Sequence, residues 1–413
     1  MNIAVYTHYF TPEISAPSMR IHDMAREWIR LGHRVQVITC FPNHPNGRLY
    51  PGYGNRLYMH EVLDGIQVHR HWTLRASNHG FVKRTLGHLS YLPAALLVSN
   101  RHIDRPDVVL GSSPTFLAAS AAARTGQRYK VPFVMEVRDL WPAVLTELDV
   151  VRNKWIYGLL ESVELGLYAR AKRVVTVTDS FRHDLVSRGV PSSKVITIPN
   201  GADLGFWTAR HPTTEIRQRL GLENCFVVLY IGTHGISHGL GAALKSAAEL
   251  RQHSEVKFVF VGSGADKPHL MQQARDMQLT NVQFLEPVSK DKVRDHYAMA
   301  DVCLLPLRDI KLFDGFIPSK MFEMMAMERP IIGAVRGEAA TILRRSNGAV
   351  VVEPENATQI SQAILELQGD PGRRRAMGVA ARQFVEDHYG RDRLAKSYAN
   401  LLEDTVQEGK VVV

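Results

Sequence analysis

The sequence lacks the segments that would carry the chain across or through a membrane. None of its apolar runs approaches the roughly 18 residues of a spanning helix, and residues 93–98 are far too short. Met1 and Asn2 lead directly into an apolar run at residues 3–6, without the basic leader and cleavage site of a signal peptide. We therefore expect a cytoplasmic protein.

Motifs for metals and redox cofactors are also missing. The three cysteines, Cys40, Cys225 and Cys303, lie in or beside apolar runs without the paired spacing of a zinc or redox site. The chain has no D-x-D, and residues 261–267 hold two glycines that do not complete a G-x-G-x-x-G fingerprint. We expect buried cysteines, no metal and no hydride-transfer cofactor.

The net charge of +9 points to an anionic partner without naming it. The basic residues are scattered, with short clusters at residues 170–173, 344–345 and 373–375, and no basic helix is interleaved with aromatic residues as in nucleic-acid readers. This distribution favours phosphorylated ligands and lipid headgroups over nucleic acid.

Length and pattern predict two α/β domains of roughly 200 residues each. Short β-branched runs alternate with helical periodicity, as in parallel sheets wound with helices. The strands are expected at residues 3–6, 35–39, 66–70, 108–111, 132–137, 173–178 and 195–198, then at 226–231, 257–261, 282–285, 302–305, 330–333 and 349–352. Residues 199–203, followed by the polar stretch 208–214, form the best junction.

Residues 313–327 are the most informative segment. Glu323 is surrounded by methionines and a phenylalanine in an expected buried helix, and an ionised carboxylate there needs a partner or a polar cleft. Helical spacing places Ser319 and Lys320 beside it near the helix start, where free N–H groups attract phosphate. We interpret this as a nucleotide site. The alternative is a capping serine, a solvated lysine and one amphipathic outlier.

Loops after the expected strands hold the other candidates, because ligands bind beyond the carboxyl ends of parallel strands. His44 lies between two prolines and is either a general base, an acceptor contact or merely exposed. Arg138 and Asp139 form either a site pair or a plain salt bridge, and Arg20 falls in the first turn of a helix near the cleft. In the second half, the four glycines of residues 232–241 would let a phosphate approach the backbone.

These motifs together resemble retaining glycosyltransferases of the GT-B fold in the GT4 group, over nearly the whole chain. Thr-Pro-Glu at 11–13, Phe-Pro-Asn-His-Pro at 41–45, Arg-Asp-Leu-Trp-Pro at 138–142 and Ile-Pro-Ser-Lys at 317–320 are most similar to the branch that builds bacterial surface polysaccharides, including the N-acetyl-L-fucosamine transferases of O-antigen and capsule pathways. The resemblance implies two Rossmann-like domains facing a central cleft. Residues 1–200 would bind the acceptor, residues 201–384 the nucleotide sugar, and residues 385–413 would form a helix crossing back to the first domain.

The resemblance implies a UDP-sugar donor, carrying an N-acetylated amino sugar, in the second domain. Glu323 corresponds to the second glutamate of the group's E-x7-E pattern and would hold the ribose. The implied donor contacts are Gly232, Gly235, Val288, Arg308, Ile317, Pro318, Ser319, Lys320, Glu323 and Glu338. Glu338 matches a glutamate that faces the donor pocket in relatives, or it is an ordinary loop carboxylate.

The chain departs from the group's pattern at three places. Gly315, next to Asp314, replaces the first glutamate, so the contact of that residue to the donor sugar is in question. After Gly232, relatives have an Arg and a Lys for the diphosphate; this chain has Thr233, His234 and His238 instead, and we expect Lys320 and Arg308 to supply the charge. Ser15 and Ala16 replace paired glycines, which would change the contact with the acceptor.

A mechanism without a dedicated nucleophile follows from the resemblance. The acceptor hydroxyl attacks from the face that the leaving group vacates, and the donor phosphate helps to remove its proton. Lys320 and backbone amides would stabilise UDP, and the residues that position the acceptor or the sugar would be Asp139, Arg138, His44, Arg20, Ser15 and Asn43.

The implied acceptor is a polyprenyl-diphosphate-linked saccharide at the inner membrane face. Residues 81–92, basic and then apolar, either touch that membrane or form a plain buried helix. Three rival functions stay open: a UDP-sugar 2-epimerase of the same fold, a non-catalytic nucleotide-sugar sensor, and a dehydrogenase.

Overall fold

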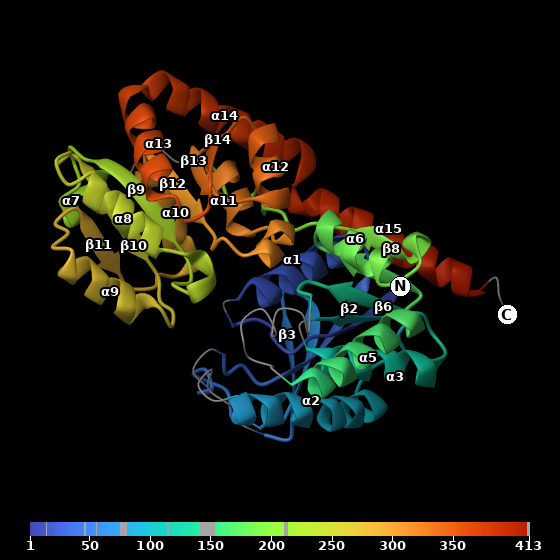
Figure 1. Cartoon of the computed structure of the whole chain (residues 1–413). Helices are drawn as coiled ribbons and strands as arrows, with labels where there is room; N and C mark the ends of the chain where they lie inside the picture. Colours follow the sequence, from blue (N-terminus) through green and yellow to red (C-terminus); the bar gives the residue numbers. More distant parts are fainter. Residues whose placement is uncertain are drawn as a thin grey trace. The chain divides into compact units, whose positions relative to one another are not determined.

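The computed structural model describes residues 1–13, 15–44, 47–54, 56–74, 81–113, 115–140, 153–209 and 214–410. Of the motif residues above, Pro45, Trp141 and Pro142 lie outside this range, as do the side chains of residues 81–86. The chain divides into two compact units (Figure 1). Unit 1 comprises Met1–Pro199 with Arg391–Val413, and unit 2 comprises Asn200–Gly390.

One sheet runs through the described part of unit 1, with its eight strands in the order β3-β4-β2-β1-β5-β6-β7-β8. All neighbouring strands are parallel except the pair β3 and β4. The strands are β1 (Asn2–Tyr6), β2 (Arg34–Cys40), β3 (Tyr58–Leu63), β4 (Ile66–His71), β5 (Val108–Ser112), β6 (Phe133–Val137), β7 (Arg173–Thr176) and β8 (Val195–Thr197). The seven strands expected in the first half are confirmed.

The edge strand β3 was not predicted. It pairs antiparallel with β4 across a two-residue turn, in which Asp64 and Gly65 have φ of 50° and 82°. An Asp-Gly pair with positive φ at both positions is typical of a tight β-hairpin. The signal was therefore present in the sequence, although β3 itself alternates polar and apolar residues too weakly to stand out.

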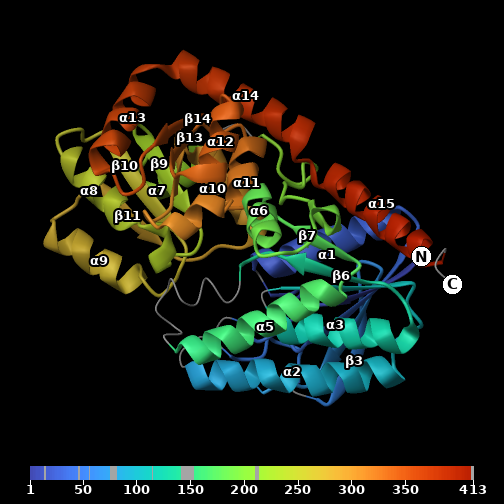
Figure 2. The same ribbon diagram turned by 45° about the vertical axis from the view of Figure 1, so that its right-hand side comes forward.

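Helices cover both faces of the unit 1 sheet (Figures 1 and 2). One layer consists of α2 (Phe81–Arg101), α3 (Phe116–Tyr129) and α5 (Lys154–Arg170), and Tyr6 of the central strand donates or accepts hydrogen bonds with Ser99 of α2 and Thr125 of α3. The opposite layer contains α1 (Ala16–Arg30) and α15 (Arg391–Lys410). The remaining elements of unit 1 are α6 (Asp179–Ser187) and η1 (Ser192–Lys194).

The last helix completes the core of unit 1. Trp28 of α1 is fully buried, donates its indole N–H to the carbonyl of Ala395 at 3.0 Å, and packs edge-on against Tyr398 with ring centroids 5.3 Å apart. Burying an indole with its N–H satisfied is strongly favourable. Side chains of α15 therefore form part of the hydrophobic core of unit 1, although the whole of unit 2 separates this helix from the rest of unit 1 in the sequence.

A second sheet forms the centre of unit 2, with the described strands in the order β11-β10-β9-β12-β13-β14, all parallel. They are β9 (Phe226–Ile231), β10 (Val256–Val261), β11 (Val282–Leu285), β12 (Val302–Pro306), β13 (Ile331–Ala334) and β14 (Ala349–Val352). All six expected strands are confirmed. The helical elements are α7 (Thr214–Leu220), η2 (Ile236–His238), α8 (Gly241–Glu249), α9 (Lys267–Asp276), α10 (Lys290–Met299), η3 (Lys311–Gly315), α11 (Lys320–Ala326), α12 (Gly337–Arg345), α13 (Ala357–Gly369) and α14 (Pro371–His388).

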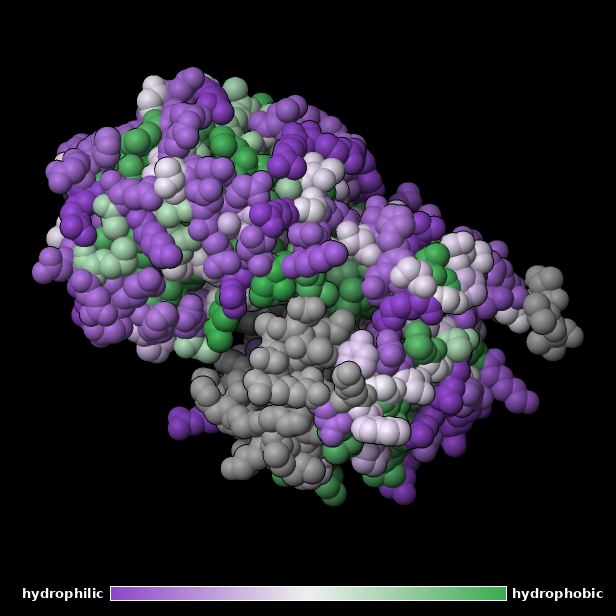
Figure 3. All heavy atoms as spheres, in the orientation of Figure 1, coloured by the Kyte–Doolittle hydropathy of each residue, from purple (hydrophilic) through white to green (hydrophobic). Residues whose placement is uncertain are grey.

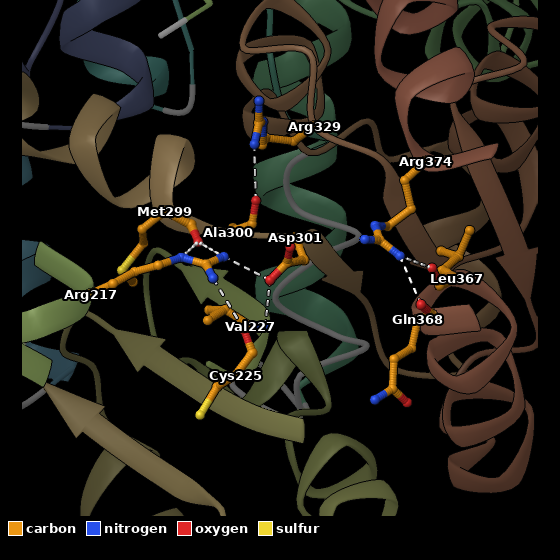
Figure 4. Close-up of polar contacts among 10 residues, drawn as sticks. All are labelled: Arg217, Cys225, Val227, Met299, Ala300, Asp301, Arg329, Leu367, Gln368 and Arg374. Carbon is orange, nitrogen blue, oxygen red and sulfur yellow. Dashed lines mark hydrogen bonds and ion pairs between the residues drawn. The ribbon is translucent and has the colours of Figure 1, made fainter. Parts of the chain in front are cut away.

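Arginines tie the helices of unit 2 to carbonyl groups away from the carboxyl ends of the strands (Figure 4). Arg217 donates to the carbonyls of Met299 and Cys225 and to the carboxylate of Asp301, which also accepts from the backbone of Val227. These bonds satisfy backbone groups at the start of β9 and β12. They stabilise the edge of the sheet at which these strands begin, and they involve no residue of the loops at the carboxyl ends of the strands.

The surface and the cysteines agree with the composition. Hydrophilic side chains cover most of the face of unit 2 seen in Figure 3. Cys40 and Cys303 are buried, Cys225 is half-buried, and all three are free thiols. Within the described residues, no helix combines the length and the apolar character needed to cross a membrane.

Candidate functional site

Glycines bring the loops of unit 2 together at the carboxyl ends of its strands. Gly262, after β10, has a φ of 139°, and a Cβ there would lie 1.9 Å from the carbonyl oxygen of Gly232, after β9. A Cβ on Gly264 would lie 2.3 Å from the carbonyl oxygen of His234. Only glycine fits such close approaches. The glycine-rich loops thus pack on each other next to the predicted nucleotide site.

Lys320 is a buried ammonium at this edge of the sheet. Its Nζ lies 4.0 Å from the ring centroid of Tyr230, and a Cβ on Gly232 would be 3.0 Å from it. Among the described residues, Nζ has no hydrogen-bond partner. Burial lowers the pKa of Lys320 to about 7, although Glu323 acts against this shift. A buried cation without hydrogen bonds is costly, and a bound anion would remove that cost.

Glu323 lies one turn along the same short helix, α11. Its carboxylate accepts a hydrogen bond of 3.3 Å from the hydroxyl of Tyr297. Burial raises the pKa of Glu323 to about 7, against the opposing effects of Lys290, Tyr297 and Lys320. The helix itself is buried through Met321, Phe322 and its other apolar residues, as the sequence predicted. It spans only seven residues, and Ser319 makes no side-chain capping bond.

The histidines in the loop after β9 are neutral at pH 7. Burial is the main cause that lowers the pKa of His234 to about 4, and nearby Lys267 and Lys320 lower it further. Burial and Lys320 lower the pKa of His238 to about 3. These imidazoles therefore cannot replace the charge of an arginine and a lysine. Of the two buried lysines near this loop, Lys267 donates to the carbonyl of Gly262, and Lys320 has no hydrogen-bond partner among the described residues.

Arg308 contacts the loop after β9, to which Gly235 belongs. The backbone N–H of Arg308 donates to the carbonyl of Ser237 at 3.0 Å, and a Cβ on Gly239 would lie 3.3 Å from Cγ of Arg308. Arg308 lines a pocket of about 310 Å³ that does not include Lys320 or Glu323. Gly235 caps the short helix η2. The role of Arg308 toward a diphosphate stays a prediction.

Glu338 lies beside the segment that replaces the first glutamate of the E-x7-E pattern. Its neighbour Gly337 has a φ of 64°, and a Cβ there would lie 1.9 Å from the carbonyl oxygen of Asp314. The first turn of α12, which carries Glu338, therefore packs on the η3 turn that ends at Gly315. The backbone that carries Glu338 therefore lies close to the position that lacks the first glutamate.

Three of the predicted donor contacts are apolar residues at the surface of the unit 2 core. Val288 and Ile317 are half-buried and pack against the core on the α11 side of the sheet, and Pro318 is half-buried before the helix. A contact of these three residues with a nucleotide stays a prediction.

In unit 1, the side chain of Arg20 links strand β6 to the end of β8 through hydrogen bonds. Its guanidinium donates to Glu136 of β6 at 3.0 Å and to the carbonyls of Ile198 and Pro199 at 2.9 and 2.8 Å. Glu136 is fully buried, yet Arg20, Arg138 and Ser112 hold its pKa below the ordinary value despite the burial that opposes them. Arg20 thus holds the end of β8 to the sheet, and a contact of Arg20 with an acceptor stays a prediction.

Arg138 is a buried arginine of unit 1 with two unpaired guanidinium nitrogens among the described residues. Its Nε and Nη1 have no hydrogen-bond partner in the described part of the chain, and its backbone N–H donates to Ser113 at 2.8 Å. Burial lowers the pKa of Arg138 to about 10, and burial raises the pKa of neighbouring Asp139 while Arg138 lowers it. The pair lies directly after β6, as the sequence predicted.

Asn43 and His44 are positioned by a carboxylate that the sequence analysis did not single out for a role. Glu13 is buried, and its carboxylate accepts from the backbone N–H groups of Asn43 and His44, both at 2.8 Å, and from Phe10 at 3.3 Å. The ring of His44 lies edge-on to Tyr9, 5.0 Å between centroids. Burial lowers the pKa of His44, so its imidazole is neutral and could accept a proton.

Ser15 caps a helix. Its hydroxyl accepts a hydrogen bond from the backbone N–H of Ser18 at 3.4 Å, at the start of α1. This is the ordinary role of a serine at this position. A contact of Ser15 with an acceptor stays a prediction.

Replacing Glu13 with glutamine should destabilise unit 1 by about 2 kcal/mol, because an amide has one acceptor oxygen for three backbone donors and leaves buried N–H groups unpaired. We expect the thermal unfolding midpoint to fall by about 5 °C. Glu27→Gln, which removes an i,i+3 pair with Arg30 on the same unit, is the matched control and should leave the midpoint nearly unchanged. Equal midpoints for both variants would contradict a structural role for Glu13.

No group of three or more His, Cys, Asp or Glu side chains within the described ranges is arranged to hold a metal ion. The two sites consist instead of one buried cation each, Lys320 and Arg138, with a carboxylate nearby.

Comparison with known proteins agrees with this geometry. Residues 15–201 match the family described as Glycosyl transferase 4-like domain, and residues 225–370 match the family described as Glycosyl transferases group 1. The chain is a glycosyltransferase with the GT-B fold. The two matched regions of the glycosyltransferase correspond to its two units, and each contains one of the buried cations.

Related sequences and solved structures align with nearly the whole length of this glycosyltransferase. WcaI of Escherichia coli strain K12, named for colanic acid biosynthesis, is 24% identical over 418 residues, which cover 97% of this chain and 99% of WcaI. Sucrose-phosphate synthase of Thermosynechococcus elongatus superposes with a TM-score of 0.76 at 16% identity, covering 98% of each chain. HepE of Anabaena in complex with UDP-glucose gives 0.73 at 15% identity, covering 98% of this chain and 100% of HepE.

Sequence reasoning about the glycosyltransferase missed the residues that support the site. Tyr230 lies under Lys320, Tyr297 donates to Glu323, and Glu13 holds two backbone N–H groups. A signal was available for Glu13, since a carboxylate between Phe10 and Ile14 in an apolar loop needs partners just as Glu323 does. The two tyrosines carried no such signal, because a tyrosine in an apolar strand or helix is ordinary core.

Proposed function

We propose that this glycosyltransferase moves an N-acetylated amino sugar from a UDP-sugar to a lipid-linked saccharide in bacterial surface polysaccharide synthesis, with retention of anomeric configuration. The observation that carries the proposal is the Nζ of Lys320, which is buried without a hydrogen-bond partner among the described residues, beside Glu323 and the glycine-rich loop. A diphosphate at this position would supply the missing anion.

In this proposal, the donor spans the loop edge of unit 2. Lys320 binds the diphosphate, and Glu323 accepts hydrogen bonds from the ribose hydroxyls, with Tyr297 orienting its carboxylate. Support for a uridine nucleotide comes from HepE, which has the same fold and was solved with UDP and with UDP-glucose. Glu338, next to Gly315, takes the place of the first glutamate at the sugar.

The bonds that form and break in the transfer step, and the proton that moves, all belong to the donor and the acceptor. The acceptor oxygen bonds to the anomeric carbon as the bond from that carbon to the UDP oxygen breaks, and the acceptor proton passes to a donor phosphate oxygen. The products are the glycosylated acceptor and UDP. Lys320, with the backbone N–H groups of Ser319 at the start of α11 and of Gly235 in the loop after β9, stabilises the charge that develops on the leaving diphosphate.

The acceptor in this proposal binds to unit 1. Arg138 and Asp139 follow β6 and position the saccharide, and Asn43 and His44 present the loop held by Glu13. The name of WcaI, which refers to colanic acid biosynthesis, supports a polysaccharide pathway. The motif resemblance to N-acetyl-L-fucosamine transferases supports the amino sugar and the polyprenyl-diphosphate carrier.

Thermal unfolding with added ligands tests the donor site. We expect UDP and UDP-N-acetylhexosamines to raise the unfolding midpoint, since about 2.7 kcal/mol of stabilisation accrues at 100 times Kd, while GDP, ADP and NAD have little effect. Glu323→Ala should remove most of the UDP response, because charge-assisted hydrogen bonds to the ribose are lost. Glu366→Ala, which breaks an exposed pair with Arg373, is the control and should respond as the wild type does.

Other outcomes would change the proposal at defined points. A response to GDP alone would show that the donor carries guanosine diphosphate instead of uridine diphosphate. A response to NAD would overturn the assignment of a nucleotide-sugar donor.

An assay with an acceptor tests the transfer itself. Incubation of UDP-N-acetylhexosamines with a polyprenyl-diphosphate saccharide should give UDP and a product whose new bond keeps the donor's anomeric configuration by NMR. Release of an altered free nucleotide sugar without acceptor would favour an epimerase, and binding without any product would favour a sensor.

A further inference from the structure

Helix α5 exposes its apolar side chains to solvent. Trp155 is 89% exposed and Leu159 67% exposed, and Ile156 and Val163 are exposed as well. At 100° per residue these four positions fall within about 100° around the helix axis, so they form one continuous stripe. A helix on the surface of a water-soluble unit would be expected to turn such a stripe inward.

The carboxylates of α5 lie away from this stripe, one buried and one partly exposed. Glu164 is fully buried and accepts hydrogen bonds from Arg188, at the C-terminal end of α6, and from the hydroxyl of Tyr168 at 2.6 Å. Glu161 also pairs with Arg188, at 3.2 Å. The exposed side of α5 therefore carries no charged residue between Trp155 and Ala169. Apolar side chains therefore lie on the exposed side of this helix as well as on its buried side, where Leu167 and Tyr168 pack.

The helices next to α5 are basic. The helix α3 contacts both α2 and α5, and the three helices lie side by side in both ribbon views (Figures 1 and 2). The sequences of α2 and α3 contain no aspartate or glutamate, and the described side chains of the two helices include the exposed Arg101, Arg124 and Arg128. Since the two carboxylates of α5 are bound to Arg188, this layer has an excess of positive charge.

The layer also exposes apolar side chains outside α5. Leu89 and Leu97 of α2 are each about half exposed. An apolar surface surrounded by positive charge matches the boundary between headgroups and acyl chains in a bilayer with anionic lipids.

We propose that the surface formed by α5 with α2 and α3 docks on an anionic lipid bilayer, with Trp155 and Leu159 placed at the boundary between headgroups and acyl chains. The charge selects this occupant over a second copy of the chain, because two copies meeting at this surface would bring two basic layers together. A tryptophan is well suited to such a boundary, since its ring is apolar and its N–H is polar. The inference rests on unit 1 alone and does not depend on the identity of the donor.

Vesicle sedimentation of the full chain tests the inference. We expect binding to vesicles of phosphatidylcholine with 30% (roughly one lipid in three) phosphatidylglycerol, and weaker binding to phosphatidylcholine alone. The double variant Trp155→Ser/Leu159→Ser should lower the partition coefficient at least about tenfold, because two large apolar side chains no longer leave water. Leu57→Ser/Val379→Ser removes two comparably exposed apolar side chains elsewhere and should bind as the wild type does.

The contribution of the basic residues to binding and the depth of Trp155 in the bilayer are measured separately. Arg124→Gln/Arg128→Gln should weaken binding to the anionic vesicles and reduce its dependence on salt. Vesicles with brominated acyl chains should quench the tryptophan fluorescence of the wild type, and Trp155→Phe should lose most of that quenching while still sedimenting. All these side chains are exposed or carry no described tertiary bond, so circular dichroism should confirm that the variants fold normally.

Three results would overturn the inference. The first is wild-type sedimentation that the Trp155→Ser/Leu159→Ser variant shares. The second is failure of the wild type to bind anionic vesicles at low salt. The third is a wild-type dimer in light scattering that this variant converts to a monomer without any vesicle binding, which would identify the surface as an interface between copies.

Discussion

Replacing Lys320 with methionine should lower kcat/KM for sugar transfer by about 100- to 1,000-fold, the usual cost of removing one group that stabilises a leaving or developing anion. Methionine keeps most of the length of the side chain and removes its charge. The buried Nζ has no hydrogen bond to lose among the described residues, so the fold itself should tolerate the change. Thermal stability without ligand should stay equal or rise, because a buried charge without hydrogen bonds is removed.

The matched control is Lys267→Met in the same unit. Lys267 is also buried, but its Nζ donates to the carbonyls of Gly262 and Leu285 and to the carboxylate of Glu286, at 2.8 to 3.0 Å. Its loss should lower stability and affect turnover less. If Lys320→Met instead kept full kcat/KM while Lys267→Met abolished it, the diphosphate would have to be assigned to the loop after β10.

The affinity for the donor should peak near pH 7 and fall on both sides. Lys320 has a pKa of about 7 in the free protein, because burial disfavours its charge, and a bound diphosphate should raise that pKa. Between the free and bound values, binding takes up a proton, so affinity falls as pH rises above 7, by up to about tenfold per unit. Below pH 7, Lys320 is charged in both states and contributes no slope.

Glu323 provides the opposite slope. Burial raises its pKa to about 7 in the free protein, and hydrogen bonds donated by the ribose should lower it on binding. Binding below pH 7 then releases a proton, so affinity falls as pH decreases toward the bound value, again by up to about tenfold per unit. The two slopes meet near pH 7 because both groups start from the same value.

Calorimetric titration with UDP-N-acetylglucosamine between about pH 5.5 and 8.5 measures both limbs, since the diphosphate of this donor does not titrate in that range. Lys320→Met should flatten the alkaline limb, and Glu323→Gln should flatten the acid limb, each leaving the other in place. A wild-type affinity that is constant across the range would show that neither group changes protonation when the donor binds.

The strands and the two-unit α/β architecture could be predicted because their signal is local. Each of the thirteen expected strands is a short run rich in β-branched or other apolar residues, and the helix of Lys320 and Glu323 is recognisable from its spacing alone. The strand β3 escaped because it lies at an edge with alternating exposure, and only the Asp64-Gly65 turn marks it.

The supporting residues of the site could not be predicted because they come from distant parts of the chain. Tyr230 lies 90 residues before Lys320, and their contact depends on how β9 and α11 meet at the edge of the sheet. The neutral state of His234 and His238 likewise depends on burial and on cations supplied by other loops. For α5, the sequence does not reveal that Glu164 faces inward, since this follows from the position of Arg188.

Unit 1 is interrupted in the sequence by the whole of unit 2, and this has a consequence for synthesis. The core of unit 1 includes Leu394, Ala395, Tyr398 and Leu402 of α15, which leave the ribosome after all of unit 2. Until then, the apolar surface around Trp28 has no cover, while unit 2 is already complete in sequence. Translation should therefore yield a finished second half beside an unfinished first half, and a chain that stops near residue 390 should be a target for chaperones and proteases.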